Sequence, residues 1–464
     1  MGTTDRSGAS VPERRAGTRS RTLSALSSEQ GATALIVLAV IAAVLLVGWG
    51  LFLLGSGEAG VVEYTADSSR AFFLAEAGIE RARVWLSEFK QNDPSGNPVG
   101  TALENQALGM GQYSFEVAAE VDLGSSLEAY EIVSTGEVDG AIRQIRAVLL
   151  AESFAVYQWF IEDDGGGHSW FKTGERFEGP VHVNGDLKID GDPWFGGRVT
   201  CVGHLIENPP SDPVFERGYE EGVAPVMLPT RDEIFAVVRT AALDAGTYAP
   251  SLGESPHFYY DVELGSPADG WFTYQGFTSA GVPVTAPEQV SIAMTNGVAW
   301  FDERIRIHGV LDGELTIGVD NDIEIIDDIV YEDSTPGSGP NPDCDDMLGL
   351  IAAGADWGDI IIAETTPNLN DCEVHAIMMA LEKNIEAENL LGSGPLRGYF
   401  RIYGGLLADL SIRLAHFDQD IIDNGYIRDY HYDNRVLTMA PPVFPLTGAY
   451  IVFTWEEVIP PVVS

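Results

Sequence analysis

Acidic side chains form two dense clusters in the second half of the chain, and clustered carboxylate oxygens are the ligands that Ca²⁺ prefers. The two clusters hold Asp320, Asp322, Asp327 and Asp328, and then Asp343, Asp345 and Asp346. Neither cluster follows the ligand order of an EF-hand loop, which closes with a Glu. A solvated acidic face is therefore the favoured interpretation. The alternative is a calcium site with the candidate ligands Asp320, Asp322, Asp343 and Asp345.

No other group of residues has the spacing of a catalytic or cofactor site. His168, His182 and His204 share one region, but their spacing differs from that of a zinc-binding His-x-x-x-His motif. The Gly-rich run at Asp164–Gly167 does not match a phosphate-binding loop. We therefore expect no catalytic residues, no enzyme activity and no cofactor apart from the calcium alternative. A carbohydrate-active enzyme is the alternative that a sugar-turnover assay would test.

Charge and cysteine content restrict the function further. The 70 acidic against 26 basic residues give a net charge of −44, which would repel nucleic-acid phosphates. Three cysteines are too few for a disulfide scaffold. Cys344 and Cys372 could form a disulfide outside the cytoplasm, and Cys201 would then remain unpaired. Aromatic side chains near the C-terminus could bind a sugar or a surface partner, although such residues are more often core. These are Tyr399, Tyr403, Tyr426, Tyr430 and Tyr432.

An uncharged apolar run, from Ala32 to Leu54, dominates the N-terminal region. Its 23 residues would form a helix of about 34 Å, enough to cross a bilayer core of about 30 Å. Residues 1–31 carry five Arg against three acids, whereas the rest of the chain is strongly acidic. The positive-inside rule then predicts a single-pass inner-membrane protein with a cytoplasmic leader and an extracytoplasmic C-terminal part.

The helical pattern continues beyond the membrane-spanning run. Apolar residues recur three and four positions apart, which places them in one stripe of an amphipathic helix. They are Phe72, Ala75, Ile79, Ala82, Leu86 and Phe89. The run Asn92–Gly96, which contains Pro94, should end the helix. A single helix over 32–92 is therefore predicted, with its apolar stripe packed against a core.

Gly31 before the apolar run, followed by RAFFLAEAGIERA at Arg70–Ala82, resembles the N-terminal segment of PilX-type minor pilins of type IV pili. This resemblance implies cleavage between Gly31 and Ala32 by prepilin peptidase. It also implies packing of the helix, including Ile36, with other pilins or pseudopilins in a filament. Most pilins have Glu at the fifth mature position, where this chain has Ile36; minor pilins of this kind often lack that Glu.

The remaining chain reads as β structure, so the predicted class is α+β. Alternating Tyr113, Phe115 and Val117, and the turn at Val138–Gly140, predict a small antiparallel meander over 93–152, a pilin-like head. Short β-branched runs between Gly, Asp and Asn turns favour a parallel β-solenoid over 153–464, with an insertion at 207–289. A sandwich or a barrel is the alternative for these strands.

The outer region has its own resemblance. Thr173–Gly197 and Gly425–Gly448 are similar to a pilus-associated β-rich domain family of unknown function, found behind PilX-type N-termini. The resemblance implies a solenoid-like surface domain and assigns no chemistry. The whole sequence thus predicts a minor pilin-like subunit of a type IV pilus or related secretion filament, present at the pilus or cell surface after assembly. A static membrane-anchored surface protein is the alternative.

Processing at Gly31 separates these two functions. We expect the mature protein to begin at Ala32, and Gly31→Leu to abolish cleavage, because the peptidase of the resembling family cuts after Gly. N-terminal sequencing of the purified protein measures this directly. Recovery of intact Met1, or of a new end within residues 55–60, would contradict the pilin-like prediction.

Overall fold

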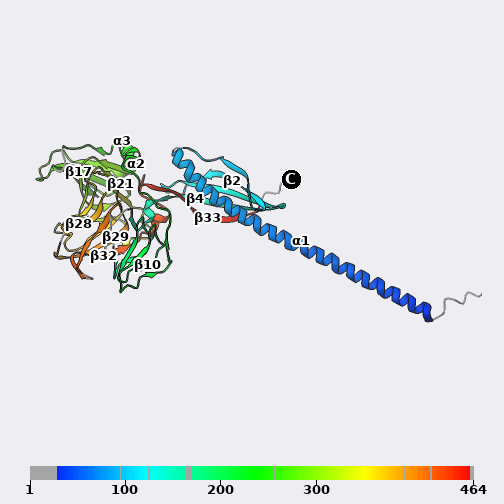
Figure 1. The fold of residues 1–464 in the computed structure, drawn as a ribbon. Helices are drawn as coiled ribbons and strands as arrows, with labels where there is room; N and C mark the ends of the chain where they lie inside the picture. Colours follow the sequence, from blue (N-terminus) through cyan, green and yellow to red (C-terminus); the bar gives the residue numbers. More distant parts are fainter. Residues whose placement is uncertain are drawn as a thin grey trace, which may run out of the picture.

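The computed structural model describes residues 29–94, 96–123, 126–162, 170–253, 257–390, 392–418 and 421–459. These residues form a long N-terminal helix, a small antiparallel sheet and a large mixed, mainly parallel β sheet (Figure 1). The predicted helix, the meander and the mainly-β character of the remainder are confirmed at this level. Most of the predicted leader, residues 1–28, lies outside the described residues.

Helix α1 (Glu29–Asn92) is 64 residues long, or about 96 Å, and extends from the body of the molecule as a rod (Figure 1). Its segment Thr33–Leu53 is long and apolar enough to cross a membrane, and none of it is buried. The helix stays continuous through Gly48 and Gly50. It ends at Asn92, as the Asn92–Gly96 run predicts.

The second half of α1 packs on a five-stranded antiparallel sheet. The order of the strands is β1-β2-β3-β4-β33. Their bounds are Ala102–Leu108, Gly111–Glu120, Ala129–Val138, Ala141–Ser153 and Leu446–Val458. The β3–β4 turn uses Asp139 and Gly140 with φ of 47° and 84°, the positive values that a tight hairpin requires.

Strand β33 corrects the predicted domain boundary, which placed all of 153–464 in the outer domain. This strand returns from the far end of the chain and pairs with β4, from Leu446 opposite Ser153 to Val458 opposite Gln144. The outer domain is therefore inserted between two adjacent strands of the small sheet. The backbone N–H of Phe154 donates to the carbonyl of Pro445 at 3.0 Å, which ties the two crossings together.

The first strands of the outer domain are very short and stack in parallel. They are β5 (Trp159–Ile161), β6 (Trp170–Lys172), β7 (Arg176–Phe177), β8 (Val181–Val183), β9 (Leu187–Asp190), β10 (Trp194–Phe195), β11 (Val199–Cys201), β12 (Leu205–Glu207), β13 (Val214–Phe215) and β14 (Tyr219–Glu221). The parallel, in-register pairing recurs at every third strand: β5, β8, β11 and β14 form one row, β6, β9 and β12 a second, and β7, β10 and β13 a third. The predicted insertion at 207–289 therefore begins too early, since β13 and β14 still belong to this stack.

The later strands continue the same arrangement. They are β15 (Tyr248–Ala249), β16 (Phe258–Leu264), β17 (Trp271–Thr278), β18 (Glu288–Ser291), β19 (Val298–Phe301), β20 (Ile305–Leu311), β21 (Glu314–Val319), β22 (Ile323–Tyr331), β25 (Met347–Ala352), β26 (Ile360–Ile362), β27 (Cys372–Ala380), β28 (Asn384–Ala387), β29 (Leu396–Ala408), β30 (Ser411–Arg413), β31 (Ala415–Asp418) and β32 (Ile421–His431), with the small hairpin β23 (Ser334–Thr335) and β24 (Gly339–Pro340). Only β16–β17–β18, β31–β32 and this hairpin pair antiparallel among the described strands of the outer domain.

In-register pairing stacks like side chains into columns inside the outer domain. One column contains Ile305, Ile323, Ile360, Ile385 and Ile412, each opposite the next and all buried. The stack of β7, β10 and β13 likewise aligns Phe177, Phe195 and Phe215. Burying each such side chain contributes about 1.5–3 kcal/mol, so the columns are a major source of stability.

The insertion contributes a helical segment on the flank of the outer domain. It runs through α2 (Arg231–Ile234), η2 (Phe235–Arg239) and α3 (Thr240–Ala245), and buries Val238 and Ala242. Thr230 and Glu233 form a capping box: Thr230 Oγ1 accepts from the N–H of Glu233, and the Glu233 carboxylate accepts from the N–H of Thr230. The remaining short helices are η1 (Phe154–Val156), η3 (Ile292–Met294) and η4 (Asn434–Leu437).

Gly136 in β3 sets how closely α1 approaches the sheet. A Cβ at this position would lie 2.0 Å from the carbonyl oxygen of Ala71 and 2.6 Å from the backbone nitrogen of Ala75. Both neighbours are helix backbone and cannot move aside as a side chain could. We expect Gly136→Ala to lower the free energy of unfolding by about 1–3 kcal/mol, the usual cost of overpacking.

Chemical denaturation followed by tryptophan fluorescence measures this effect. The matched control is Gly185→Ala, since a Cβ there meets nothing within 4 Å. Equal stabilities of the two variants would show that the helix does not depend on contact at Gly136.

Tyr450 tests whether β33 is an integral part of the small sheet. Its side chain is buried in the core between α1 and the sheet, with its ring centroid 6.2 Å from that of Tyr130. We expect Tyr450→Ala to cost about 3–5 kcal/mol in the same denaturation measurement, as for other large buried rings. The control Phe453→Ala, on the same strand but more than a third exposed, should cost far less. Similar small losses for both would mean that β33 is only loosely attached.

Candidate assembly interface

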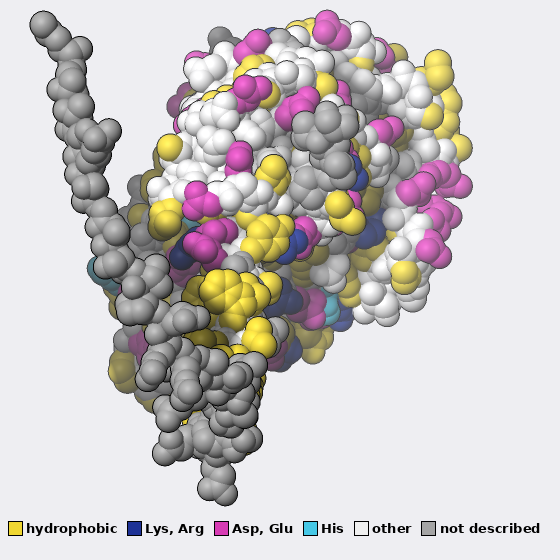
Figure 2. Space-filling view, turned by 90° about the vertical axis from the view of Figure 1, so that its right-hand side faces the viewer, with side chains coloured by type: hydrophobic (Ala, Val, Ile, Leu, Met, Phe, Trp, Pro, Cys, Tyr) yellow, Lys and Arg dark blue, Asp and Glu magenta, His cyan; other side chains and the backbone are white. Residues whose placement is uncertain are grey.

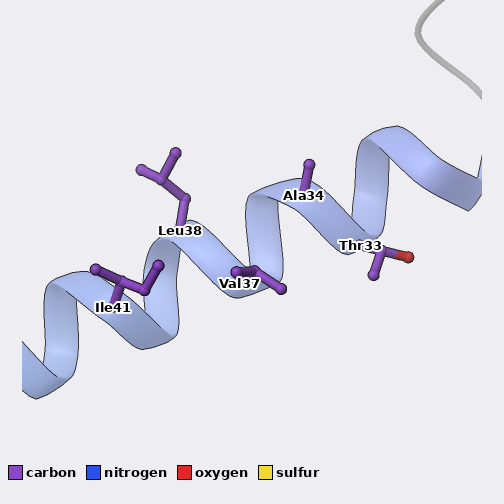
Figure 3. A pocket seen from close by; sticks show the side chains of 5 residues that line it. All are labelled: Thr33, Ala34, Val37, Leu38 and Ile41. Atoms are coloured by element: carbon purple, nitrogen blue, oxygen red, sulfur yellow. The ribbon is translucent and has the colours of Figure 1, made fainter.

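The first half of α1 is an apolar surface with no cover among the described residues. Fourteen large apolar side chains between Leu35 and Leu53 are each more than half exposed. Figure 3 shows part of this surface, where Thr33, Ala34, Val37, Leu38 and Ile41 line a shallow hollow along the helix. Leaving side chains of this size in water costs about 1.5–3 kcal/mol each, so roughly 20–40 kcal/mol favours another environment. Water is therefore an unfavourable environment for this half of α1.

The predicted processing and packing residues lie at the start of this surface. Gly31 and Ala32 lie in the first turns of α1, and only their backbone is described. Ile36 is 64% exposed. The helix between Thr33 and Leu53 carries no acidic or basic residue, so nothing in it could pair with a buried amine.

The second half of α1 presents its apolar stripe to the small sheet. Ala75, Ile79, Ala82 and Leu86 are buried against core side chains such as Phe115, whereas Phe72 and Phe89, at the ends of the stripe, are half-buried. The Phe72 ring also contacts Trp455 of β33, with ring centroids 5.9 Å apart. The same helix thus has one half with no cover and one half fixed on a sheet.

Three polar contacts hold α1 on the sheet at points along its length. Arg83 Nε donates to the carbonyl of Tyr450 at 2.8 Å, and Arg143 Nε donates to Ser68 Oγ at 2.8 Å. Near the end of the helix, Lys90 Nζ lies 2.9 Å from the Glu128 carboxylate. Burial alone would lower the pKa of Lys90, but hydrogen bonds to Glu128 and Tyr130 outweigh it and raise the pKa above its usual value. Lys90 therefore stays charged and paired at neutral pH.

The candidate calcium ligands do not come together. Asp320 forms a bidentate pair with Arg231, with the shortest N···O distance 2.6 Å, and Asp322 accepts the N–H of Asp359 at 2.9 Å. Asp343 and Asp345 are exposed side chains in a different turn. Among the described residues, no three His, Cys, Asp or Glu side chains are arranged to hold a metal ion. The calcium alternative therefore has no geometric support.

Asp322 instead belongs to a line of polar side chains along one corner of the stacked strands. Asp359 accepts from the backbone and side-chain N–H groups of Asn384, and Asn384 accepts from Ser411. Burial raises the pKa of Asp322 to about 6. Asp322 and Asp359 accept hydrogen bonds from backbone N–H groups at the starts of β26 and β28. This structural role could not be predicted from the sequence.

The possible disulfide between Cys344 and Cys372 is not formed in this structure, in which all three cysteines are free and buried. The Cys344 thiol lies 3.3 Å from an oxygen of Asp346, to which it donates, and Cys372 lies at the start of β27 with its side chain in the core. Burial raises the pKa of Cys344 to about 11 and that of Cys372 well above its usual value. Both thiols are therefore protonated and unreactive.

Most of the histidines and tyrosines considered for binding are buried where they are described, whereas the His204 side chain is 82% exposed, with Nδ1 3.6 Å from Glu221. His182 is buried, with Nδ1 2.7 Å from Thr200 and Nε2 2.8 Å from Asn184, and burial lowers its pKa. Tyr403, Tyr426 and Tyr430 are buried in the outer domain, whereas Tyr399 is 41% exposed. His168 lies outside the described residues.

A buried His–Glu pair was missed by the sequence reasoning. His375 Nδ1 accepts the N–H of Tyr331 at 3.1 Å, so its Nε2–H donates to Glu373 at 3.0 Å. Although burial alone would raise the pKa of Glu373, hydrogen bonds from His375 and Gly337 hold it below its usual value. Both partners are fully engaged with the backbone, so the pair stabilises the strand stack and has no free group for catalysis.

The comparisons with known proteins are limited in extent. A family model described as a domain of unknown function (DUF4900) matches residues 112–203, from the second strand of the small sheet into the first parallel strands. No curated protein matches the chain. Among solved structures, the chain is similar to the competence-associated pilin ComZ from Thermus thermophilus, at 13% identity and a TM-score of 0.28. That similarity covers 84% of this chain and 97% of that one.

Proposed function

We propose that this protein is a minor pilin-like subunit of a type IV pilus or a related secretion filament. The observation that carries the proposal is the division of α1, with Thr33–Leu53 fully uncovered and the stripe Ala75–Leu86 buried on the small sheet. The apolar half spans the inner membrane before assembly. It then exchanges lipid for the helices of other pilins or pseudopilins. The outer domain is carried to the pilus or cell surface.

Ile36 suggests where in the filament the subunit is placed. In a pilin core, a Glu at the fifth mature position can neutralise the terminal amine of an adjacent subunit, and an unpaired buried charge is costly. Ile36 cannot supply this carboxylate, and no other residue from Thr33 to Leu53 can. A subunit with no neighbour ahead of it needs no such partner. We therefore place this chain at or near the filament tip, where it could help to initiate assembly.

The outer domain favours the same position. We propose that its large mixed sheet is a parallel β-solenoid, supported by in-register stacking at positions 176, 194 and 214 and by the buried isoleucine column. About 300 residues give a radius of gyration near 19 Å, against about 13 Å for a 100-residue head. A body of this size is difficult to repeat along a closely packed shaft.

We further propose a binding or adhesive role for the outer domain, and no enzymatic one. The support is that Asp320, His182 and the His375–Glu373 pair are engaged in structural hydrogen bonds or ion pairs. A static anchored surface protein would share the exposed apolar helix. It would have no need for a helix that continues unbroken from the apolar segment onto the sheet.

Immunogold labelling of sheared filaments, with antibody to the outer domain, tests the position. We expect few gold particles, concentrated at filament ends, because the missing carboxylate and the bulky domain both disfavour a place in the shaft. Antibody to the major subunit is the control and should label the whole length. Regular labelling of this protein along the shaft would contradict the tip assignment, and its absence from sheared filaments would contradict the filament assignment itself.

A further inference from the structure

Lys172 and Asp190 form a direct contact between two successive coils of the outer domain, where a coil means three consecutive strands such as β6, β7 and β8. The two residues lie opposite each other on the parallel strands β6 and β9, and Lys172 Nζ contacts Asp190 Oδ2. Their side chains are only 16% and 22% exposed. Because paired strands lie about 4.8 Å apart, the register of the backbone holds the amine against the carboxylate.

The two carboxylate oxygens of Asp190 have different partners. Oδ2 faces the amine of Lys172, whereas Oδ1 accepts a hydrogen bond from Asn208 Nδ2 at 3.1 Å. Asn208 directly follows β12, which pairs with β9 on the side away from β6. A donor in this position is the kind of group that stabilises the oxyanion of a tetrahedral intermediate in acyl transfer. One oxygen is therefore placed to leave and the other to carry the developing negative charge.

An aromatic ring and a buried ion pair surround Lys172. Its Nζ lies 5.4 Å from the centroid of the Phe417 ring, which the Arg428 guanidinium also contacts, at 4.6 Å. The backbone N–H of Lys172 donates to the Glu175 carboxylate at 2.6 Å, and Glu175 is itself buried and paired with Arg428. These contacts fix both the backbone and the side chain of Lys172, so the amine stays opposite Asp190.

The choice of Lys at this position is informative because lysines are rare in the chain. Only four of the 26 basic residues are Lys: Lys90, Lys172, Lys188 and Lys383. Figure 2 shows many Asp and Glu side chains on the visible face of the outer domain, with fewer Lys and Arg side chains among them. Arg supplies the cation in many ion pairs of this domain. A guanidinium can only neutralise a carboxylate, whereas an amine can also act as a nucleophile towards it.

We propose that Lys172 and Asp190 condense to an amide, an intramolecular isopeptide bond between β6 and β9. The ammonium first passes one proton to the Asp190 carboxylate. Nζ then attacks Cγ, while Asn208 stabilises the negative charge on Oδ1. The Cγ–Oδ2 bond breaks, and Oδ2 takes a second proton from Nζ and leaves as water. One ammonium and one carboxylate give one amide and one water, so the step needs no oxidant or other reactant.

The bond closes one coil of the outer domain into a covalent ring. The ring spans residues 172–190 and contains β7 and β8, in the first part of the stack after the chain leaves the small sheet. A cross-link of this kind restricts the unfolded chain as a disulfide does, and the three cysteines of this chain are free. The inference does not rest on the proposed filament function.

Intact-mass spectrometry of the full-length protein, solubilised in detergent, tests the inference. We expect nearly all molecules to be lighter, by one water molecule, than the sequence calculated from the measured N-terminus. Lys172→Arg keeps the positive charge but cannot form the bond, so it should have the full calculated mass. Asp190→Asn should lose ammonia in place of water, because the side-chain nitrogen is then the leaving group.

Peptide mapping locates the bond. Trypsin does not cut after an acylated lysine, so the digest should contain residues 147–176 joined to residues 189–198 as one branched peptide. The matched control is the pair of Lys90 and Glu128, in which the ammonium contacts both carboxylate oxygens, at 3.0 and 2.9 Å, and the carboxylate is 40% exposed. Trypsin should cut normally after Lys90, because that pair stays ionic.

Asn208→Ala tests the role of the hydrogen bond to Oδ1. Asn208 is exposed, so the variant should melt like the Lys172→Arg protein, in which the bond cannot form. We expect condensation at least about tenfold slower than in the parent protein, measured as the condensed fraction at intervals after synthesis. Equal rates would overturn the role of Asn208. The full calculated mass in the parent protein, or a water loss located elsewhere in the chain, overturns the isopeptide bond and identifies an ordinary ion pair.

Discussion

The close contact between α1 and the small sheet is the constraint on which the rest of the structure depends. Gly136 allows the helix backbone to lie directly on β3, and Arg83 binds the same helix to the backbone of β33. Fixing the second half of α1 in this way keeps the first half, Thr33–Leu53, clear of every other described element. The exposed apolar rod thus follows from packing at its far end.

The return of β33 to the small sheet makes the outer domain part of the same unit. The chain leaves the sheet at Ser153 and re-enters it at Leu446, and these residues face each other across adjacent strands. Two covalent crossings, joined by hydrogen bonds at Pro445, restrain the outer domain far more than a single linker would.

The parts of the fold that depend on local pattern could be predicted from the sequence. The stripe from Ala75 to Leu86, the end of α1 at Asn92 and the capping box at Thr230 each arise from residues within a few positions of one another. The columns inside the outer domain depend on in-register pairing of distant short strands, and their spacing is too irregular to count in advance. For the outer domain, only the mainly-β character could therefore be predicted from the sequence.

Contacts between distant residues account for what the sequence reasoning missed. Arg83 and Tyr450 are 367 positions apart, and no local signal in Leu446–Val458 distinguishes it from a strand of the outer domain. The sequence reasoning considered a Cys344–Cys372 disulfide because the two residues are near each other in the sequence and are expected outside the cytoplasm. In the structure both thiols lie in the protein core and stay free. The aspartates were grouped by sequence, whereas folding separates Asp320 and Asp322 from the turn that holds Asp343.

The central claim is that the uncovered half of α1 exchanges lipid for other helices. Photo-crosslinking from Leu45, 68% exposed in the middle of the apolar segment, tests it directly when membrane and sheared-filament fractions are compared. The account predicts lipid adducts in the membrane fraction and, in filaments, adducts with the N-terminal helix of another pilin-like subunit. Lipid adducts alone, with no protein adduct in any fraction, would contradict it and identify α1 as a static anchor.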